Sequence, residues 1–282
     1  MHVRVVSVCS PLPLALSERT GTPATTWTGR LLVVPMDGSH WTGLKAVAEE
    51  LGHRGHTVVV VMPEVSMRLD SSKHYITKRF PVPYGPELLE ELQARNTEAL
   101  QSTTLSLMER ISSRISSFKK FVHYQQFNFD AVLTDPAMPT GAILAYNLSL
   151  PAVYMLRGLP CGMDSISTAC PDPSSYVPRF FTKNSDHMCF SERVLNVLVS
   201  MVEPLICKAI YWSFEDVASR FLQRTVSMKE ILSTGALWLF RYDFTMEFPR
   251  PLMPNMVLIG GLNCAIRSPL SLVSFLRIII LT

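Results

Sequence analysis

The feature that most constrains the fold is the stretch RLLVVPMDGSHW at residues 30–41. It begins with a short apolar run, long enough for a buried strand, and Pro35 ends that strand because proline has no N–H to give to a sheet ladder. The Asp-Gly pair that follows predicts a tight turn. Residues 41–54 then carry apolar side chains at helical spacing, and a second apolar run occupies 57–62. This strand–turn–helix–strand unit predicts an α/β fold with a doubly wound, mainly parallel sheet of the Rossmann-like kind.

A second unit of the same type lies further along the chain. Residues 130–134 predict a strand that stops at Asp135-Pro136, residues 139–147 a helix, and residues 151–156 another strand. Further strands are expected at 75–80, 236–241 and 256–260, and helices over 88–122, 191–214, 215–224 and 228–232, with a long ordered loop at 157–183.

His40 and Asp135 each come just after a predicted strand. In a parallel sheet the carboxyl ends of the strands meet at one edge, and ligands bind there. Histidine takes up protons near neutral pH, and a carboxylate on its other ring nitrogen orients the imidazole. The pattern therefore predicts a His40–Asp135 catalytic dyad. A structural histidine held by a hydrogen bond is the alternative that the residues alone leave open.

Composition excludes several classes of protein. Of 282 residues 48% are apolar and 17% charged, which is typical of a globular chain with a large core. The net charge of +3 is scattered without a basic run, so nucleic acid is not an expected partner. The six cysteines form no CxxC pair and no Cys/His set at zinc spacing, so no metal site is predicted; whether Cys161 and Cys170 pair is left open.

The two ends of the chain read differently from its middle. Residues 1–29 are expected to be an atypical N-terminal segment and linker, because prolines break the apolar start that a secretory signal needs. Residues 265–282 are expected to be a divergent apolar tail, too short for a membrane span. The domain proper is predicted at 30–264, and Asn147 lies in a glycosylation sequon, NLS.

A set of motifs in this order resembles a known family. They are LLVVPMDGSHW at 31–41, HRGHTVVVVMPE at 53–64, FPVPY at 80–84, FDAVLTDP at 129–136 and, further on, LSLPAVYMLRGLPC, CPDPSSYVPR, SDHM, FLQR, LWLFR and PRPLMPNMVLIGGLNC. Taken together, from Leu31 to Cys264, they are similar to the UDP-glucuronosyltransferases, and within them to family 1, subfamily A.

The resemblance implies the N-terminal, acceptor-binding domain of a two-domain GT-B glycosyltransferase. In such an enzyme a small lipophilic phenol, alcohol, amine or carboxylic acid receives glucuronic acid from UDP-glucuronic acid, the co-substrate, and no further cofactor is expected. The family's catalytic histidine falls on His40, as general base, and its partner aspartate on Asp135. Ser39 and Trp41, which flank His40, are candidate substrate-binding residues. The resemblance also implies the endoplasmic reticulum membrane or lumen, and homo- or hetero-oligomers with full-length family members.

The sequence departs from the family at both ends. The usual cleavable signal is not evident, and after Cys264 the family sequence gives way to AIRSPLSLVSFLRIIILT, without the donor-binding domain. The chain alone is therefore expected to be inactive. The alternative function is a non-catalytic module that binds acceptors or regulates full-length relatives. A weaker third hypothesis, an unrelated oxidoreductase, lacks the GxGxxG fingerprint.

Overall fold

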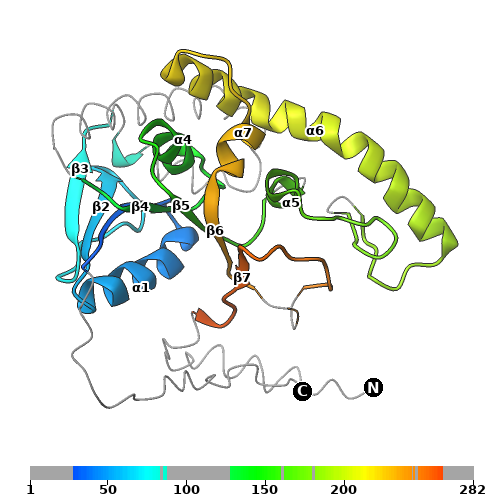
Figure 1. Cartoon of the computed structure of the whole chain (residues 1–282), viewed down its shortest axis with the longest axis horizontal. Helices are drawn as coiled ribbons and strands as arrows, with labels where there is room; N and C mark the ends of the chain where they lie inside the picture. The colour runs from blue at the N-terminus through cyan, green and yellow to red at the C-terminus, as the bar shows by residue number, and fades with distance from the viewer. Residues whose placement is uncertain are drawn as a thin grey trace.

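The computed structural model of the chain describes residues 28–82, 85–87, 128–159, 162–179, 182–242, 244 and 247–262 (Figure 1). The helix predicted over 88–122 and the predictions for residues 1–27 and the tail lie outside these residues. In chain order the elements are β1 (Arg30–Val34), α1 (Ser39–His53), β2 (Thr57–Pro63), β3 (Ile76–Phe80), β4 (Ala131–Thr134), α4 (Thr140–Asn147), β5 (Ala152–Leu156), α5 (Met163–Thr168), α6 (Phe190–Leu222), α7 (Met228–Ser233), β6 (Gly235–Phe240) and β7 (Met256–Leu258).

The strands form one seven-stranded sheet in the order β3-β2-β1-β4-β5-β6-β7, and every neighbouring pair is parallel. This is the doubly wound order, in which the chain moves outward from β1 in one direction and then from β4 in the other. The predicted Rossmann-like fold is confirmed. The order reverses between β1 and β4, so the crevice where such folds bind ligands lies next to the ends of these two strands.

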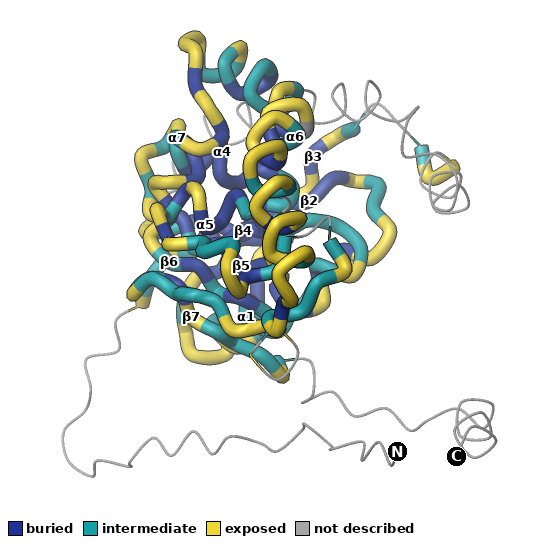
Figure 2. Tube along the Cα trace, turned by 90° about the vertical axis from the view of Figure 1, so that its right-hand side faces the viewer, coloured by how far each residue is buried: buried dark blue, intermediate teal, exposed yellow. Residues whose placement is uncertain are grey.

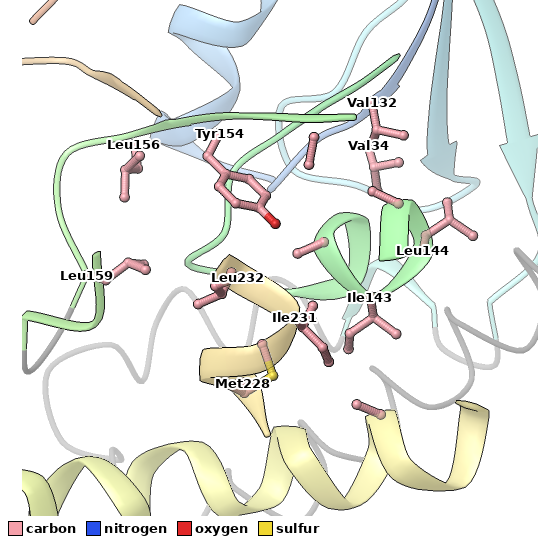
Figure 3. Packing of buried hydrophobic residues seen from close by; sticks show 14 of the residues in the cluster. Val34, Val132, Ile143, Leu144, Tyr154, Leu156, Leu159, Met228, Ile231 and Leu232 are labelled. Carbon is pink, nitrogen blue, oxygen red and sulfur yellow. The ribbon is translucent and has the colours of Figure 1, made fainter. Parts of the chain in front are cut away.

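Helices cover both faces of the sheet, which is why its strands, apart from the edge strand β3, are nearly unbroken apolar runs. On one face, α1 packs its Leu44 and Ala48 against Val33, Val60 and neighbouring strand residues. On the other face, α4 and α7 pack over Tyr154 and the side chains around it (Figure 3). Successive residues of one strand point to opposite faces, so Leu32 belongs to one core and Val33 to the other.

Two element predictions differ from the structure. The helices predicted at 191–214 and 215–224 are one helix, α6, because neither glycine nor proline stands at the expected break; Pro204 lies inside the helix, where it removes one backbone hydrogen bond. The helix ends at Leu222, and Gln223, the residue after it, has a left-handed φ of 56°. The loop predicted at 157–183 contains the short helix α5.

Most of the first part of α6 is exposed, and only a few of its residues are buried (Figure 2). Its inward residues Asn196 and Glu203 are polar, whereas Phe190, Met201 and Leu205 are largely exposed. Among the described residues, no single helix has the length and apolar character to cross a membrane; within α6 the segments Phe190–Ala209 and Tyr211–Leu222 meet these criteria only when taken together.

Candidate active site

The ends of β1 and β4 bring the two predicted catalytic residues to one place. Val34 and Thr134 are partners in the parallel ladder, so the loops after them start at the same level of the sheet. The Thr134 hydroxyl donates a hydrogen bond of 2.8 Å to the Val34 carbonyl and ties the two strand ends together. Asp135 follows at once, and His40 lies in the first turn of α1. The register therefore sets the distance between the two loops.

His40 and Asp135 form a direct hydrogen bond. Nδ1 of His40 lies 2.6 Å from Oδ2 of Asp135, and the second carboxylate oxygen accepts the backbone N–H of Ala137 at 2.9 Å. The Asp135 side chain is 1% exposed, whereas that of His40 is 30% exposed. The aspartate is thus fixed inside the protein, and the imidazole bound to it remains open to solvent.

This arrangement determines which nitrogen of the ring can act as a base. An ionised carboxylate only accepts hydrogen bonds, so the proton of the pair is assigned to Nδ1 of His40. Nε2 then carries the free lone pair. A hydroxyl brought to Nε2 can give up its proton as it attacks an electrophile, and Asp135 stabilises the imidazolium that forms.

The turn before α1 holds His40 at the edge of the sheet. The carboxylate of Asp37 accepts hydrogen bonds of 2.7–3.0 Å from the backbone N–H groups of Gly38, Met67 and Arg68. Gly38 has a φ of 83°, in the region that glycine adopts without strain. The turn is therefore locked to the loop that follows β2, and α1 starts from a fixed point.

Comparison with known proteins identifies the family of the chain. The family model described as UDP-glucoronosyl and UDP-glucosyl transferase matches residues 29–276. The chain belongs to that family. The resemblance to UDP-glucuronosyltransferases in its motifs is thereby confirmed, and family membership associates the chain with glycosyl transfer.

Its relatives include two human enzymes. UDP-glucuronosyltransferase 1A6 of Homo sapiens is 43% identical over 259 residues, which cover 86% of this chain and 49% of the relative. UDP-glucuronosyltransferase 1A1 of Homo sapiens is 36% identical over 278 residues, which cover 93% and 52%. The chain spans about half the length of the curated relatives it matches. Among solved structures, CalG4, the calicheamicin glycosyltransferase, has a TM-score of 0.49 at 13% identity, covering 83% of this chain and 53% of CalG4.

Ser39 and Trp41 of this family member have different surroundings. Ser39 is exposed at the start of α1, beside His40. Trp41 is 2% exposed, its indole N–H donates to Asp70 at 3.0 Å, and its ring meets that of Tyr75 edge-on. The geometry gives Trp41 a packing role in the core, and its contact with substrate stays a prediction.

A cavity of about 460 Å³ lies beyond the carboxyl ends of β5 and β6. Part of its wall is apolar or aromatic, with Leu159, Val177, Tyr242 and Phe248. The rest is charged and internally paired: Arg250 binds the buried carboxylate of Asp164, and Arg179 binds Asp172 and Glu203. Arg250 also lies over the rings of Phe240 and Tyr242. The pairs brace the wall, and burial raises the pKa of Glu203 despite the opposing effect of Arg179.

The structure also shows where the cysteines and the predicted glycosylation site lie. Within the part of the chain that the structure describes, no group of three His, Cys, Asp or Glu residues is arranged to hold a metal ion. Cys170 is a free thiol whose Sγ lies 3.3 Å from the Pro251 carbonyl oxygen, and Cys161 lies outside the described residues. Asn147 is exposed at the last residue of α4, and its glycosylation stays a prediction.

One residue of the site has no sequence signal that singles it out. Arg241, directly after β6, donates from Nη1 to the carbonyl oxygen of His40 at 3.3 Å. The two residues are 201 positions apart, and neither spacing nor periodicity relates them. Only the order of the strands brings them together.

Proposed function

We propose that this chain forms the acceptor side of a UDP-glucuronosyltransferase, with His40 as general base and Asp135 as its partner. The observation that carries the proposal is the 2.6 Å bond between the half-exposed imidazole and the buried carboxylate, placed at the point where the strand order reverses. Family membership supports glycosyl transfer as the reaction.

In the proposed reaction the acceptor is a small lipophilic molecule that carries a hydroxyl, amine or carboxyl group. For a hydroxyl acceptor, Nε2 of His40 takes the proton while the oxygen attacks the anomeric carbon of UDP-glucuronic acid. The bond from that carbon to the diphosphate oxygen breaks, UDP leaves with the electron pair, and the anomeric centre inverts. Asp135 stabilises the imidazolium until the proton is passed to water.

The acceptor is proposed to enter at the carboxyl edge of the sheet. The apolar and aromatic part of the 460 Å³ cavity, which includes Leu159, Tyr242 and Phe248, suits a flat lipophilic molecule. We also propose that the protein is located at the endoplasmic reticulum and that Asn147 carries a glycan. A mass measurement of the protein isolated from cells tests the glycan directly, and a glycan on Asn147 would require entry into the lumen.

The test of the dyad uses the 282-residue chain by itself and a fusion of it to the remaining half of human UDP-glucuronosyltransferase 1A6. Each is incubated with UDP-glucuronic acid and 4-methylumbelliferone. We expect turnover by the fusion, and a loss of about 10²–10⁴-fold in kcat/KM for His40→Ala, the range that a general base supplies. We expect a loss of similar order for Asp135→Asn, because the amide favours the wrong tautomer of His40.

The matched control is His187→Ala, since the side chain of His187 is 94% exposed and far along the chain from the dyad. It should leave the rate unchanged. Undiminished turnover by the His40→Ala fusion would reject the proposed base. We expect no turnover by the chain alone. If the chain alone does turn the substrate over, and His40→Ala abolishes this activity, the expectation that the chain alone is inactive is wrong.

A non-catalytic role, in which the chain binds acceptors without transferring a sugar, is the second candidate function, favoured by the accessible cavity at the carboxyl edge of the sheet. In that case the chain binds 4-methylumbelliferone, measured by its fluorescence, while the fusion turns nothing over.

A further inference from the structure

Arg241 is fixed at the carboxyl edge of the sheet by its own backbone. Its N–H donates to the Leu156 carbonyl at 2.7 Å, which continues the pairing of β6 with β5 by one residue. From there the half-buried side chain reaches the first turn of α1. Its Nη1 donates to the carbonyl oxygen of His40, at 3.3 Å.

The helix has a matching gap at Gly43. A Cβ built on this residue would lie 2.8 Å from both Cζ and Nε of Arg241, closer than real Cβ atoms approach other atoms. The guanidinium therefore rests on the bare backbone of α1, one turn after His40. Glycine is a poor helix former, so its presence in the interior of α1 is explained by this contact.

The guanidinium is also electrostatically coupled to the dyad. Burial lowers the pKa of Arg241, the neighbouring Arg157 lowers it further, and Asp135 opposes both. Arginine remains protonated under all these influences. A permanent positive charge thus lies near enough to Asp135 for the two charges to attract each other.

We infer that Arg241 is a positioning residue for His40, which it holds through the backbone of the catalytic turn rather than through the imidazole. The inference rests on the proposed role of His40. No side chain caps the N-terminus of α1, so the first turn depends on outside contacts to keep its place. Arg241 makes one of these contacts at the residue that carries the imidazole.

The mechanical consequence is a fixed ring position. If the first turn of α1 shifts, Nδ1 moves away from Asp135 and Nε2 moves away from the acceptor. A displacement of about 1 Å costs on the order of 10²-fold in rate. Arg241 would in this way link the end of β6 to the dyad without touching the reacting atoms.

The experiment observes His40 directly, in the full 282-residue chain labelled with ¹⁵N-histidine. The ring nitrogen shifts and the Hδ1 proton of His40 report its tautomer and its bond to Asp135. We expect Arg241→Met to shift or broaden these signals and Arg241→Lys to restore them in part, because lysine keeps the charge but has a single donor group.

Arg157→Met is the matched control. It removes the same charge from the end of the neighbouring strand, but Arg157 is exposed and the structure shows no bond between it and His40. It should leave the Hδ1 signal in place. An equal change in Arg157→Met and Arg241→Met would mean that charge alone is responsible, and would reject positioning.

Gly43→Ala keeps the charge and displaces the guanidinium, so it tests the contact even where Arg241→Met fails to fold. The signal of His53, at the far end of α1, shows whether the helix is intact. We expect the His40 signal to change and the His53 signal to stay. A folded Gly43→Ala with an unchanged His40 signal would overturn the inference. Absence of turnover in the fusion, with the His40 response intact, would instead reject the proposed function.

Discussion

At the scale of single residues, the site depends on two side chains 95 positions apart whose bond is set by the backbone around them. His40 stands after a turn locked by Asp37, and Asp135 uses its other oxygen to accept the N–H of Ala137. The buried carboxylate of Asp135 cannot adopt another rotamer without losing hydrogen bonds to both His40 and Ala137. The residue next to His40, Trp41, illustrates the opposite case, in which a motif residue faces the core.

Trp41→Phe separates the packing role from the predicted substrate contact. The substitution removes the 3.0 Å bond to Asp70 and leaves a small void, so we expect a loss of about 1–3 kcal/mol in the free energy of unfolding. Affinity for 4-methylumbelliferone should stay the same. Chemical denaturation and fluorescence titration measure the two quantities.

Trp212→Phe, at an exposed position of α6, is the control and should change neither quantity. Weaker acceptor binding by Trp41→Phe at unchanged stability would restore the substrate role of Trp41.

At the scale of elements, the site is held by close contact between α4 and β4. A Cβ at Gly141 would lie 2.1 Å from Oγ1 of Thr134, the hydroxyl that binds the Val34 carbonyl. Glycine is needed here because the helix approaches the strand directly beneath the dyad. The short helix and the strand end therefore form one rigid support for Asp135.

Gly141→Ala tests this support. In an exposed helix, replacing glycine by alanine stabilises the protein by about 1 kcal/mol. If Gly141→Ala instead lowers the free energy of unfolding, the loss is due to the clash between the new Cβ and Thr134. We expect a loss of about 1–3 kcal/mol, the usual cost of overpacking a core, together with loss of the Thr134–Val34 bond. Denaturant unfolding gives the free energy, and the control is Gly29→Ala, where the nearest atom lies at an ordinary 3.5 Å. Equal stability of Gly141→Ala and the unchanged protein would show that α4 can move away.

At the scale of the whole molecule, two cores lie on opposite faces of one sheet, and tyrosines in and beside one of them link the free energy of unfolding to pH. Burial raises the pKa of Tyr154, in the middle of the sheet, and raises the pKa of Tyr242 to about 12. The unfolded chain binds the tyrosine proton less tightly, with a pKa near 10. The stability that neutral tyrosine contributes is therefore complete below pH 10 and is lost as the pH rises through 12.

We expect the melting temperature to fall between pH 10 and 12, and to fall less steeply in Tyr242→Phe, which has no proton to lose. Thermal unfolding followed by circular dichroism at half-unit pH steps measures this. Tyr176→Phe, at an exposed tyrosine, should keep the slope of the unchanged protein. The same slope in Tyr242→Phe would show that this hydroxyl is not responsible.

Much of the fold and of the dyad could be predicted from the sequence. The apolar runs, the proline that ends β1 and the Asp-Pro after β4 are local signals, and strand and helix periods follow from local geometry. Two elements differ from the prediction: α6 is undivided, since no glycine or proline stands at residues 214–215 where a break was expected, and α5 has no side-chain cap that would mark its start.

By itself the sequence determined the α/β class, the strand ends that carry His40 and Asp135, and the family to which the chain belongs. Only the tertiary structure decided that Trp41 faces the core, that Gly141 packs closely against Thr134 and that Arg241 reaches His40. The reason is physical: periodicity acts between residues a few positions apart. Contacts such as that of Arg241 depend instead on strand order and register, which arise only when the distant segments pack together.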